Sequence, residues 1–482
     1  MKSEKLQDAI GMIDENLLIE SPNNKEKQKK TAKHFVKWTA PIAAVLALAF
    51  IITGFFGKET PFVLNAYAIA EARYPETAPY PENEQSLDFE KRHNAWSADK
   101  RERRSYYEQA GSIEHFVKNS LFEILSDENN DNPVYSPLNI YMALAMLAEI
   151  TDGESRNEVL SLLGSESIQS LRKKANALWN ANYCNDGAVT SILASSLWLN
   201  DSVNFNENTL KTLAEEYFAS SYRGTMGSGD FNQALQNWLN EQTGGLLKDQ
   251  IHGIEMPADT VMALFTTIYF RAKWETEFFE KNNTKDIFHG KNGDTTVDFM
   301  HESELYGNYY WGENFSATSK RLENSGSMWF ILPDEGTSVD TLLSDEEALA
   351  FIGSIEAPWK NHKELMVNLS VPKFDISAEI NLKKALQTLG VEECFDLEKA
   401  NFSPLLKEDD AEVFLSEAKH GARVAIDEEG VTAAAYTEMI LCGAGMPPQD
   451  EIDFVLDRPF IFVITGESGL PLFIGVVRNI ET

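Results

Sequence analysis

The most continuous hydrophobic pattern of the chain lies near its start. Residues 38–57 read WTAPIAAVLALAFIITGFFG without a charged side chain, and six lysines fall between residues 25 and 37. Twenty helical residues span about 30 Å, the hydrocarbon thickness of a bilayer, and flanking lysines favour the cytoplasmic side. We therefore expect a cytoplasmic segment over 1–37, a transmembrane helix over 38–57, and a single-pass location in the cell membrane with an extracellular domain.

Two other interpretations of this segment stay open. A cleaved signal peptide would use Ala66-Tyr67-Ala68 as its cleavage box, although the segment before the apolar run is long and the run exceeds an ordinary signal core. A buried core helix is the second alternative, but a surface helix of a globular domain needs a polar stripe that this segment lacks.

Residues 58–110 show neither a clean helical period nor a strand period. Pro75, Pro79 and Pro81 lie close together, and the stretch from residue 88 to 104 is dense in charges of both signs. Proline extends a chain and charge keeps it in water. We expect a stalk or linker here, in which the charged stretch could form a local helix.

From Gly111 onward the patterns indicate one large domain, residues 111–482. Helical spacing follows Ser112 as a cap, and Ser136-Pro137 opens a second, almost entirely apolar helix. Later segments are rich in strand formers, and helices dominate early while strands dominate late, so the expected class is α+β with large sheets. The expected strands are Val261–Phe270, Met328–Leu332, Met366–Val371, Phe460–Thr465 and Leu472–Val477, with a hairpin turn at residues 466–469 and a helix over Ile380–Leu389.

Charge, cysteine content and missing motifs narrow the function. The 482 residues carry 42 Lys and Arg against 75 Asp and Glu, and a net charge of −33 disfavours nucleic acid as a partner. Three widely spaced cysteines give neither a disulfide framework nor a CxxC metal site, and we expect no metal and no cofactor. No GxSxG, HExxH, P-loop or GxGxxG motif occurs, so the chain is not expected to be an enzyme. Because triads assemble from distant residues, a membrane-tethered hydrolase remains an alternative.

The segment from residue 426 to 448, IDEEGVTAAAYTEMILCGAGMPP, has an unusual composition. On a two-residue period Val431, Ala433, Ala435 and Thr437 share a small and mostly apolar face, whereas the opposite face carries the bulky and charged groups. Such a segment can lie in the middle of a sheet or exposed as a loop, and Gly430 allows the backbone change of a hinge. A plain strand followed by a loop is the simpler alternative.

The chain from Gly111 to its C-terminus resembles the serpin family in five blocks, which stand in the family's order. A single block would be weak, whereas five in order are specific. The blocks are NPVYSPLNI at 132–140, IYFRAKW at 268–274, Leu332-Pro333 with VPKF at 371–374, the hinge at 427–435, and RPFIF at 458–462 with LFIG at 472–475 and Asn479.

This resemblance implies an α+β fold of three β-sheets with eight or nine helices and an exposed reactive-centre loop. It implies a suicide substrate: a serine endopeptidase cuts the loop and forms a covalent acyl complex, and the cut loop inserts into the main sheet and distorts the protease. With the apolar segment, it suggests a membrane-anchored, bacterial-type member that acts as a monomer. A non-inhibitory carrier or chaperone of the same fold is the alternative, although the small, uncharged hinge argues against it.

The resemblance also assigns the loop. Taking Glu428 as the family's seventeenth residue before the cut places the reactive bond between Ala444 and Gly445, with neighbouring bonds at Cys442 or Met446 as alternatives. A small alanine suits an elastase-like or subtilisin-like serine protease, and some such loops serve papain-like cysteine proteases. The hinge residues are Glu428, Glu429, Gly430, Val431, Thr432, Ala433, Ala434 and Ala435.

Two further groups match family positions with a controlling role. Lys373 and Glu428 match a salt bridge where the loop enters the main sheet, and Trp274 would pack beside them. Thr266 stands where the family usually has asparagine, which puts the details of its hydrogen bonding in doubt, and His420 could equally be an ordinary buried histidine. The group that controls sheet opening comprises Ser136, Asn139, Thr266 and His420.

Overall fold

The computed structural model describes residues 64–82, 86–126, 131–245, 251, 253–407, 413–416, 418–431 and 450–481. The chain divides into two compact units, residues 1–61 and 62–482, and every described residue lies in the second unit. The segment 38–57, the loop residues 432–449 and the predicted reactive bond between Ala444 and Gly445 lie outside the described residues.

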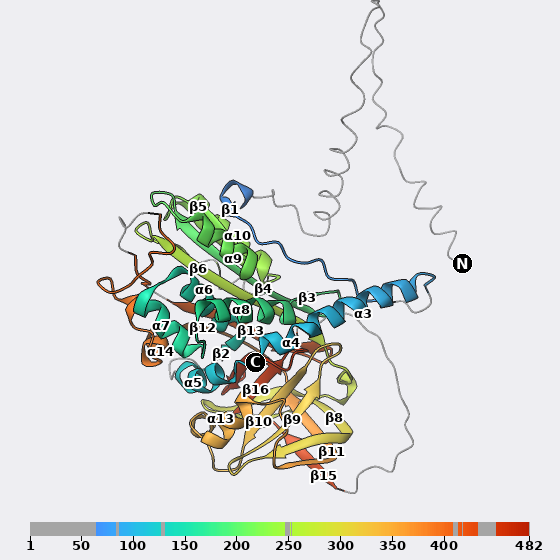
Figure 1. The fold of residues 1–482 in the computed structure, drawn as a ribbon. Coiled ribbons are helices and arrows are strands. Elements are labelled where there is room, and N and C mark those ends of the chain that lie inside the picture. Colours follow the sequence, from blue (N-terminus) through green and yellow to red (C-terminus); the bar gives the residue numbers. More distant parts are fainter. Residues whose placement is uncertain are drawn as a thin grey trace, which may run out of the picture. The chain divides into compact units, whose positions relative to one another are not determined.

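The helices of the first half pack beside one another and against strands of the main sheet (Figure 1). Ser136 caps α6 by accepting a hydrogen bond from the backbone N–H of Asn139 at 3.1 Å, and Pro137 occupies the first helical position, as predicted. Every residue of α6 except Ala143 is buried, which explains its continuous apolar sequence. These helices are α5 (Glu114–Leu125), α6 (Pro137–Ile150), α7 (Gly153–Leu162) and α8 (Ile168–Asn182).

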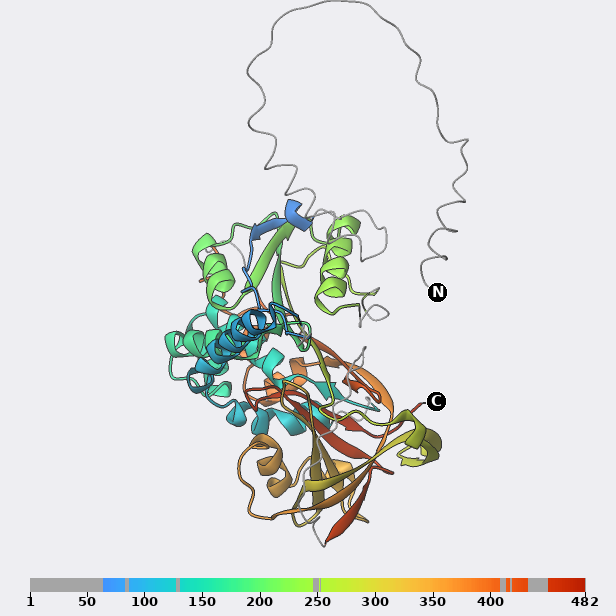
Figure 2. The ribbon, with the colours of Figure 1, turned by 90° about the vertical axis from the view of Figure 1, so that its right-hand side faces the viewer.

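The main sheet has eight strands in the order β1-β5-β4-β6-β14-β13-β12, with β3 paired to β4 off this path. Alternate residues of β4 enter two different cores: Leu193 and Leu197 face the large core that includes α9 (Glu207–Glu216), whereas Ala194 and Trp198 face a smaller core under α10 (Gly229–Gln242). The two helices therefore cover opposite faces of the sheet (Figure 2). The strands are β1 (Ala68–Ala70), β3 (Cys184–Asn185), β4 (Thr190–Asn200), β5 (Ala219–Gly224), β6 (Met262–Lys273), β12 (Phe374–Asn381), β13 (Lys419–Ile426) and β14 (Gly430–Val431).

A second network has nine strands in the order β15-β11-β8-β9-β10-β16-β17-β2, with β7 paired to β8. The long strand β8 pairs with β11 and β7, and its last three residues also pair with β9, so two groups of strands are joined into one hydrogen-bonded network. The strands are β2 (Val134–Tyr135), β7 (Thr284–Gly290), β8 (Gly293–Trp311), β9 (Phe315–Arg321), β10 (Ser327–Pro333), β11 (His362–Pro372), β15 (Glu451–Val455), β16 (Phe460–Thr465) and β17 (Pro471–Val477). Short helices α12 (Val339–Leu342), α13 (Glu346–Gly353) and α14 (Lys383–Thr388) complete the fold.

Residues 64–82 and 86–110, in the segment expected to be a stalk, pack on the folded unit. β1 pairs with the outer strand β5, and helix α3 (Phe89–Ser105) precedes the short α4 (Tyr107–Ala110). The indole N–H of Trp96 donates to a carboxylate oxygen of Asp186 at 2.8 Å, and Arg104 forms an ion pair of 2.7 Å with Glu467. The local helix allowed for in the charged stretch is therefore present and bonded to distant parts of the fold.

The predicted location, a single-pass cell-membrane protein with an extracellular domain, is corrected. Among the helices of the described residues, none is both long enough and apolar enough to cross a bilayer. The apolar segment that motivated the prediction, residues 38–57, lies outside those residues.

Candidate functional site at the opening of the main sheet

The two-residue strand β14 lies between β6 and β13 at one end of the main sheet. Gly430 pairs with Lys273 and Val431 pairs with Ala272 in β6, and on the other side Val431 pairs with Ile426 in β13. Beyond these residues the described part of the chain shows no ladder that joins β6 directly to β13. We call the stretch of β6 and β13 beyond β14, where the described residues show no ladder between these two strands, the slot.

Gly430 is required by close packing. A Cβ atom at this position would lie 2.4 Å from the carbonyl oxygen of Ala272 and 2.8 Å from Cα of Lys273. Its φ is not among the positive values that glycines of this chain adopt, so the sharp backbone change expected of a hinge is not the reason for glycine here. Val431, next in the chain, is buried, which agrees with the inward face predicted for it.

The turn before β14 is held by backbone and side-chain hydrogen bonds. The Asp427 carboxylate accepts from the N–H groups of Glu429 and Gly430 at 2.9 and 3.1 Å. Burial raises the pKa of Asp427 even though these two bonds oppose the shift. The indole N–H of Trp274 donates to the carbonyl oxygen of Asp427 at 2.9 Å, and its backbone N–H donates to that of Glu429 at 3.0 Å. Trp274 thus ties the hinge to the end of β6.

Glu428 is the charged anchor of the same turn. Its carboxylate forms an ion pair with Lys373 and accepts from the side-chain amide of Asn283. Burial alone would raise the pKa of Glu428, but the hydrogen bonds from Lys373 and Asn283 outweigh it and lower that pKa. The structure therefore brings together the predicted Lys373, Glu428 and Trp274, and adds Asn283, which the sequence did not single out.

A buried lysine beside Trp274, Lys320, was also not predicted from the sequence. Lys320 of β9 is 5% exposed, forms an ion pair with Glu302, and lies over the rings of Phe278 at 4.4 Å and Trp274 at 5.7 Å. Burial lowers the pKa of Lys320. Ser316, Thr318 and Lys320 alternate along one face of β9, which in sequence looks like a solvent-facing polar face, so no pattern could have revealed this burial.

The group predicted to control sheet opening lies further along the slot. The imidazole Nε2 of His420 in β13 accepts from the backbone N–H of Ser136 at 3.0 Å, while the Ser136 hydroxyl caps α6 at Asn139. Complete burial lowers the pKa of His420 to about 4, so the ring is neutral at pH 7, as its role of acceptor requires. Thr266 in β6 shows no hydrogen bond from its side chain to any of these three among the described residues.

Extending the register of β14 along both strands would set Thr266 and His420 opposite each other across the slot. Each lies six residues from its hinge partner, Thr266 from Ala272 and His420 from Ile426. Each is also on the same face as that buried partner, because the separation is an even number. The structure thus joins Ser136 by hydrogen bonds to both His420 and Asn139, and the extended register would set Thr266 level with His420 on the opposite strand.

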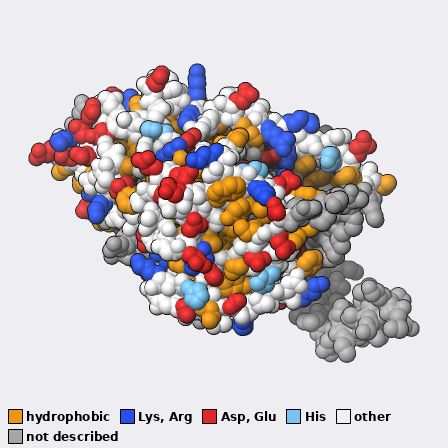
Figure 3. Space-filling view, turned by 90° about the horizontal axis from the view of Figure 1, so that it is seen from below, with side chains coloured by type: hydrophobic (Ala, Val, Ile, Leu, Met, Phe, Trp, Pro, Cys, Tyr) orange, Lys and Arg blue, Asp and Glu red, His pale blue; other side chains and the backbone are white. Residues whose placement is uncertain are grey.

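The two ends of the loop are fixed on different sheets. Its first described neighbour is β14 of the main sheet, and the chain resumes at Asp450, just before β15 pairs in parallel with β11. Figure 3 views the molecule from below, where β11 and β15 lie in Figure 1, and shows hydrophobic side chains gathered amid scattered acidic ones. Exposed large hydrophobic residues of β15 and of β8, the partner of β11, include Val455 of β15 and Leu305, Tyr306 and Trp311 of β8.

Comparison with known proteins decides the family. The family model described as Serpin (serine protease inhibitor) matches residues 113–480. The chain belongs to the serpin family. Neuroserpin of Mus musculus is 28% identical over 377 residues, which cover 73% of this chain and 87% of that protein. Alpha-1-antitrypsin of Meriones unguiculatus is 28% identical over 371 residues, which cover 74% and 87%.

Solved structures agree with this serpin fold. The native state of tengpin, a thermophilic serpin, superposes with a TM-score of 0.66 at 27% identity and covers 88% of this chain and 100% of its own. This coverage exceeds the span of the family model, so the likeness reaches into the N-terminal segment that packs on the domain. The comparisons confirm the predicted family and fold, but they do not support the expected membrane-anchored, bacterial-type form.

Proposed function

We propose that this serpin is an inhibitor that traps serine endopeptidases by loop cleavage and insertion. The observation that carries the proposal is the slot itself: β14 already pairs with both β6 and β13, and beyond it those two strands lack a shared ladder in the described residues. A cleaved loop can continue β14 along this slot without rearranging the pairing that exists. The serpin family and the likeness to alpha-1-antitrypsin support the same conclusion.

The chemistry belongs to the protease. Its catalytic serine attacks the carbonyl carbon of Ala444, the bond to the nitrogen of Gly445 breaks, and the released amine takes a proton from the protease's general acid. The carbonyl of Ala444 then forms an ester with the protease. Insertion carries the tethered protease along the sheet before water can hydrolyse that ester.

The hinge register defines how the loop would insert. Val431 stands opposite Ala272 and Ile426, so six residues further on Thr437 would stand between Thr266 and His420, on the same face of the sheet. We therefore propose that Thr437 completes the opening group, whose Thr266 departs from the family's asparagine. At the far end of the 12-residue strand β6, Leu441 would stand opposite Met262. Leu441 lies three residues before Ala444.

Insertion along this register is strongly favourable. Each ladder hydrogen bond contributes about 0.5–1.5 kcal/mol net, so a full strand bonded on both sides gains on the order of 10 kcal/mol. This is comparable to the whole stability of a typical domain, about 5–15 kcal/mol. The intact protein is then held by a kinetic barrier and is not the most stable state of its chain. The inward positions must be small or apolar, as Val431, Ala433 and Ala435 are.

The target class follows from the residue before the cut. Alanine at position 444 fits a shallow specificity pocket, so the partners are elastase-like or subtilisin-like serine proteases. Trypsin-like enzymes need Arg or Lys, and the sequence has neither between Gly430 and Asp457.

The deciding experiment mixes the full chain with pancreatic-type elastase or subtilisin and looks for a complex that survives SDS. The expected result is one covalent complex, together with a released C-terminal peptide whose mass shows that it begins at Gly445. Protease whose catalytic serine has been chemically blocked should form no complex. Cleavage without a complex would identify a non-inhibitory serpin, and a peptide that begins elsewhere would overturn the assignment of the reactive bond.

A further inference from the structure

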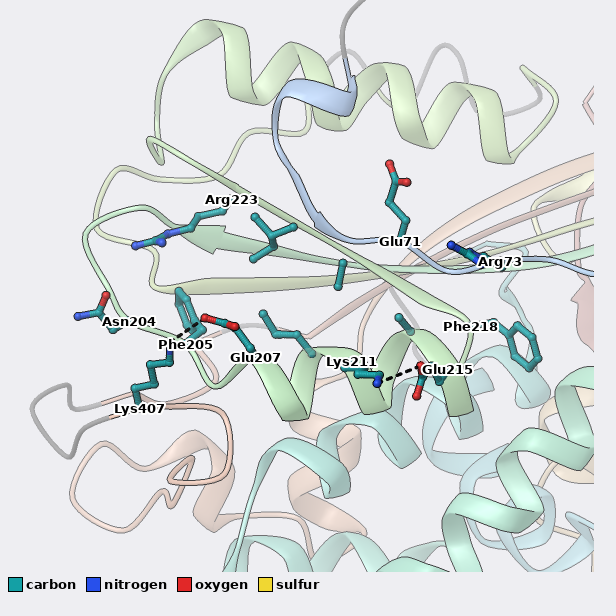
Figure 4. Close-up of a pocket in the computed structure, with 14 residues that line it drawn as sticks. Glu71, Arg73, Asn204, Phe205, Glu207, Lys211, Glu215, Phe218, Arg223 and Lys407 are labelled. Atoms are coloured by element: carbon teal, nitrogen blue, oxygen red, sulfur yellow. Dashed lines mark hydrogen bonds and ion pairs between the residues drawn. The ribbon is translucent and has the colours of Figure 1, made fainter. Parts of the chain in front are cut away.

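A cavity of about 870 Å³ lies between the N-terminal segment and helix α9, far from the slot in sequence (Figure 4). Residues Ile69 to Arg73 form one wall, α9 forms the opposite wall, and Arg223 of β5 lies at one end. The first wall precedes residue 113, where the match to the family model begins. The volume falls within the range of small-molecule sites, about 300–1,000 Å³.

The apolar lining of this cavity is unusual in two respects. Ile69 is 49% exposed, so a large hydrophobic side chain stands at the cavity wall without being covered. Phe218 has a φ of +53°, a left-handed conformation that is rare for a bulky residue. Its ring stacks on Trp179 with centroids 3.7 Å apart, which holds an aromatic surface at the cavity. Leu210 and Ala214 of α9 complete this apolar lining.

Most acidic groups of the rim are already neutralised by lysines. Glu207 forms an ion pair with Lys407 at 2.8 Å, and this partner lowers the pKa of Glu207. Glu215 pairs with Lys211 at 3.6 Å. The remaining carboxylate of the lining, Glu71, points away from α9 in Figure 4.

The two arginines of the rim have no carboxylate partner among the described residues. Arg223 donates from Nη2 to the backbone carbonyl oxygens of Asp201 and Val203, and its Nε is buried without an acceptor in that part of the chain. Arg73 is exposed, and the described residues offer it neither an ion pair nor a hydrogen bond. Figure 4 shows Arg73 and Phe218 at the same end of the cavity. A positive group and an aromatic surface therefore line the same cavity, in a chain whose net charge is −33.

We propose that this cavity binds a small amphipathic anion. A carboxylate or a phosphate monoester would pair with the guanidinium of Arg73, and an apolar body would lie along Ile69, Leu210 and Phe218. The bound molecule joins the N-terminal segment to α9, so it stabilises the packed arrangement of the two by mass action.

The test measures binding to the full chain by isothermal titration calorimetry. The probes are decanoate and decyl phosphate, below their micelle-forming concentrations, with inorganic phosphate and 1-decanol as head-only and body-only controls. We expect saturable binding of at least one of the two amphipathic probes and no saturable binding of either control. The relative affinities of decanoate and decyl phosphate distinguish a free carboxylate from a phosphate headgroup as the natural source. No saturable binding of either amphipathic probe overturns the proposal, as does equal binding of a control.

Two variants and two matched controls locate the site. Ile69→Glu adds a repelling charge to the apolar wall and Arg73→Gln removes the pairing charge, and each should weaken binding by at least about tenfold. Ile287→Glu, at a similarly exposed isoleucine of β7, and Arg101→Gln, at an exposed arginine of α3, should leave affinity within about twofold. All four positions are at the surface, and unchanged thermal unfolding without probe would show that folding is intact. Equal affinity in all four proteins, or loss in only one of the two site variants, overturns the proposal. Failure here leaves the inhibitor proposal untouched, since no protease is involved.

Discussion

The entry and the centre of the slot in the main sheet are built in opposite ways. At the entry, Glu428 is paired with Lys373, and backbone carbonyls of the hinge accept hydrogen bonds from Trp274. At the centre, one hydrogen bond joins Ser136 to His420, and the side-chain Nδ2 of Asn139 is buried without an acceptor among the described residues. The entry therefore anchors the start of the inserted strand, while the centre has polar groups that a new strand could satisfy.

This difference suggests a division of labour. Bonds at the entry hold the turn before β14 in place while the strand advances, so they set how readily the loop enters the slot. Groups at the centre gain partners only after the strand has advanced, so they add to the stability of the inserted form. The following changes test this division, beginning with the largest expected effect.

Replacing Ala433 with arginine should abolish inhibition and convert the chain into a cleaved substrate. In the proposed inserted register this residue would stand just past the entry on the inward face, where a buried charge without a partner strongly opposes insertion. SDS gels should show the cleaved chain and no covalent complex. Ala434→Arg is the matched control, because the adjacent residue would face outward in the same register and its replacement should leave the complex intact. A stable complex at full stoichiometry with Ala433→Arg would falsify the insertion mechanism.

Cutting the loop should raise the thermal unfolding temperature by more than about 10 °C. A gain of about 10 kcal/mol, spread over the unfolding entropy of a domain of this size, corresponds to a shift of that order. Differential scanning calorimetry before and after cleavage with a trace of protease measures it. Cleaved Ala433→Arg should show a much smaller rise, and an equal rise in both proteins would mean that insertion is not its source.

Lowering the pH should reduce the free energy of unfolding through protonation of His420. The pKa of this buried ring is about 4, whereas an unfolded histidine titrates near 6.5, so between these values only the unfolded chain takes up a proton. Its contribution is therefore fully present above pH 6.5 and is lost as the pH falls towards 4, by up to about 3 kcal/mol. Chemical denaturation across this range, compared with His420→Gln, isolates the effect from the carboxylates. If both proteins show the same pH slope, His420 is not the group responsible.

The entry ion pair should contribute the least to stability. The side chain of Lys373 is 34% exposed and that of Glu428 17% exposed, and such pairs couple by about 1 kcal/mol or less. A double-mutant cycle with Lys373→Met and Glu428→Gln measures the coupling, and the surface pair Arg423–Asp375 of the neighbouring strands gives the comparison. We expect the entry variants to change the rate of complex formation more than the free energy of unfolding. A coupling well above that of Arg423–Asp375 with an unchanged rate would reverse this assignment.

The sequence predicted the parts of the fold that local patterns control. Ser136-Pro137 marked the start of α6, and the turn after Thr465 marked the hairpin of β16 and β17; both are confirmed. The family resemblance predicted the contact between Lys373 and Glu428, which lie far apart in the chain. Their exact partners, such as Asn283, depend on tertiary packing that no local pattern reports.

The N-terminal segment shows what local patterns cannot predict. β1 has only three residues, too few for a visible strand period, and α3 is so rich in charge that it has no apolar stripe. Its packing depends on single side chains such as Trp96 and Arg104, whose partners lie about 90 and 360 residues away. The burial of Lys320 could not be predicted for a related reason: in the sequence, a buried lysine looks the same as a lysine on the surface.

Strand β1 has a further consequence for how molecules of this protein meet one another. The outer strand of a sheet displays unpaired N–H and C=O groups and can recruit a strand from another molecule, which leads to aggregation. By pairing with Tyr222 and Ser221, Ala68 and Ala70 occupy part of that border on β5. The N-terminal segment thus covers part of the outer edge of the sheet, at β5, while the slot lies inside the sheet between β6 and β13. This covering leaves fewer places where a neighbouring chain can add a strand.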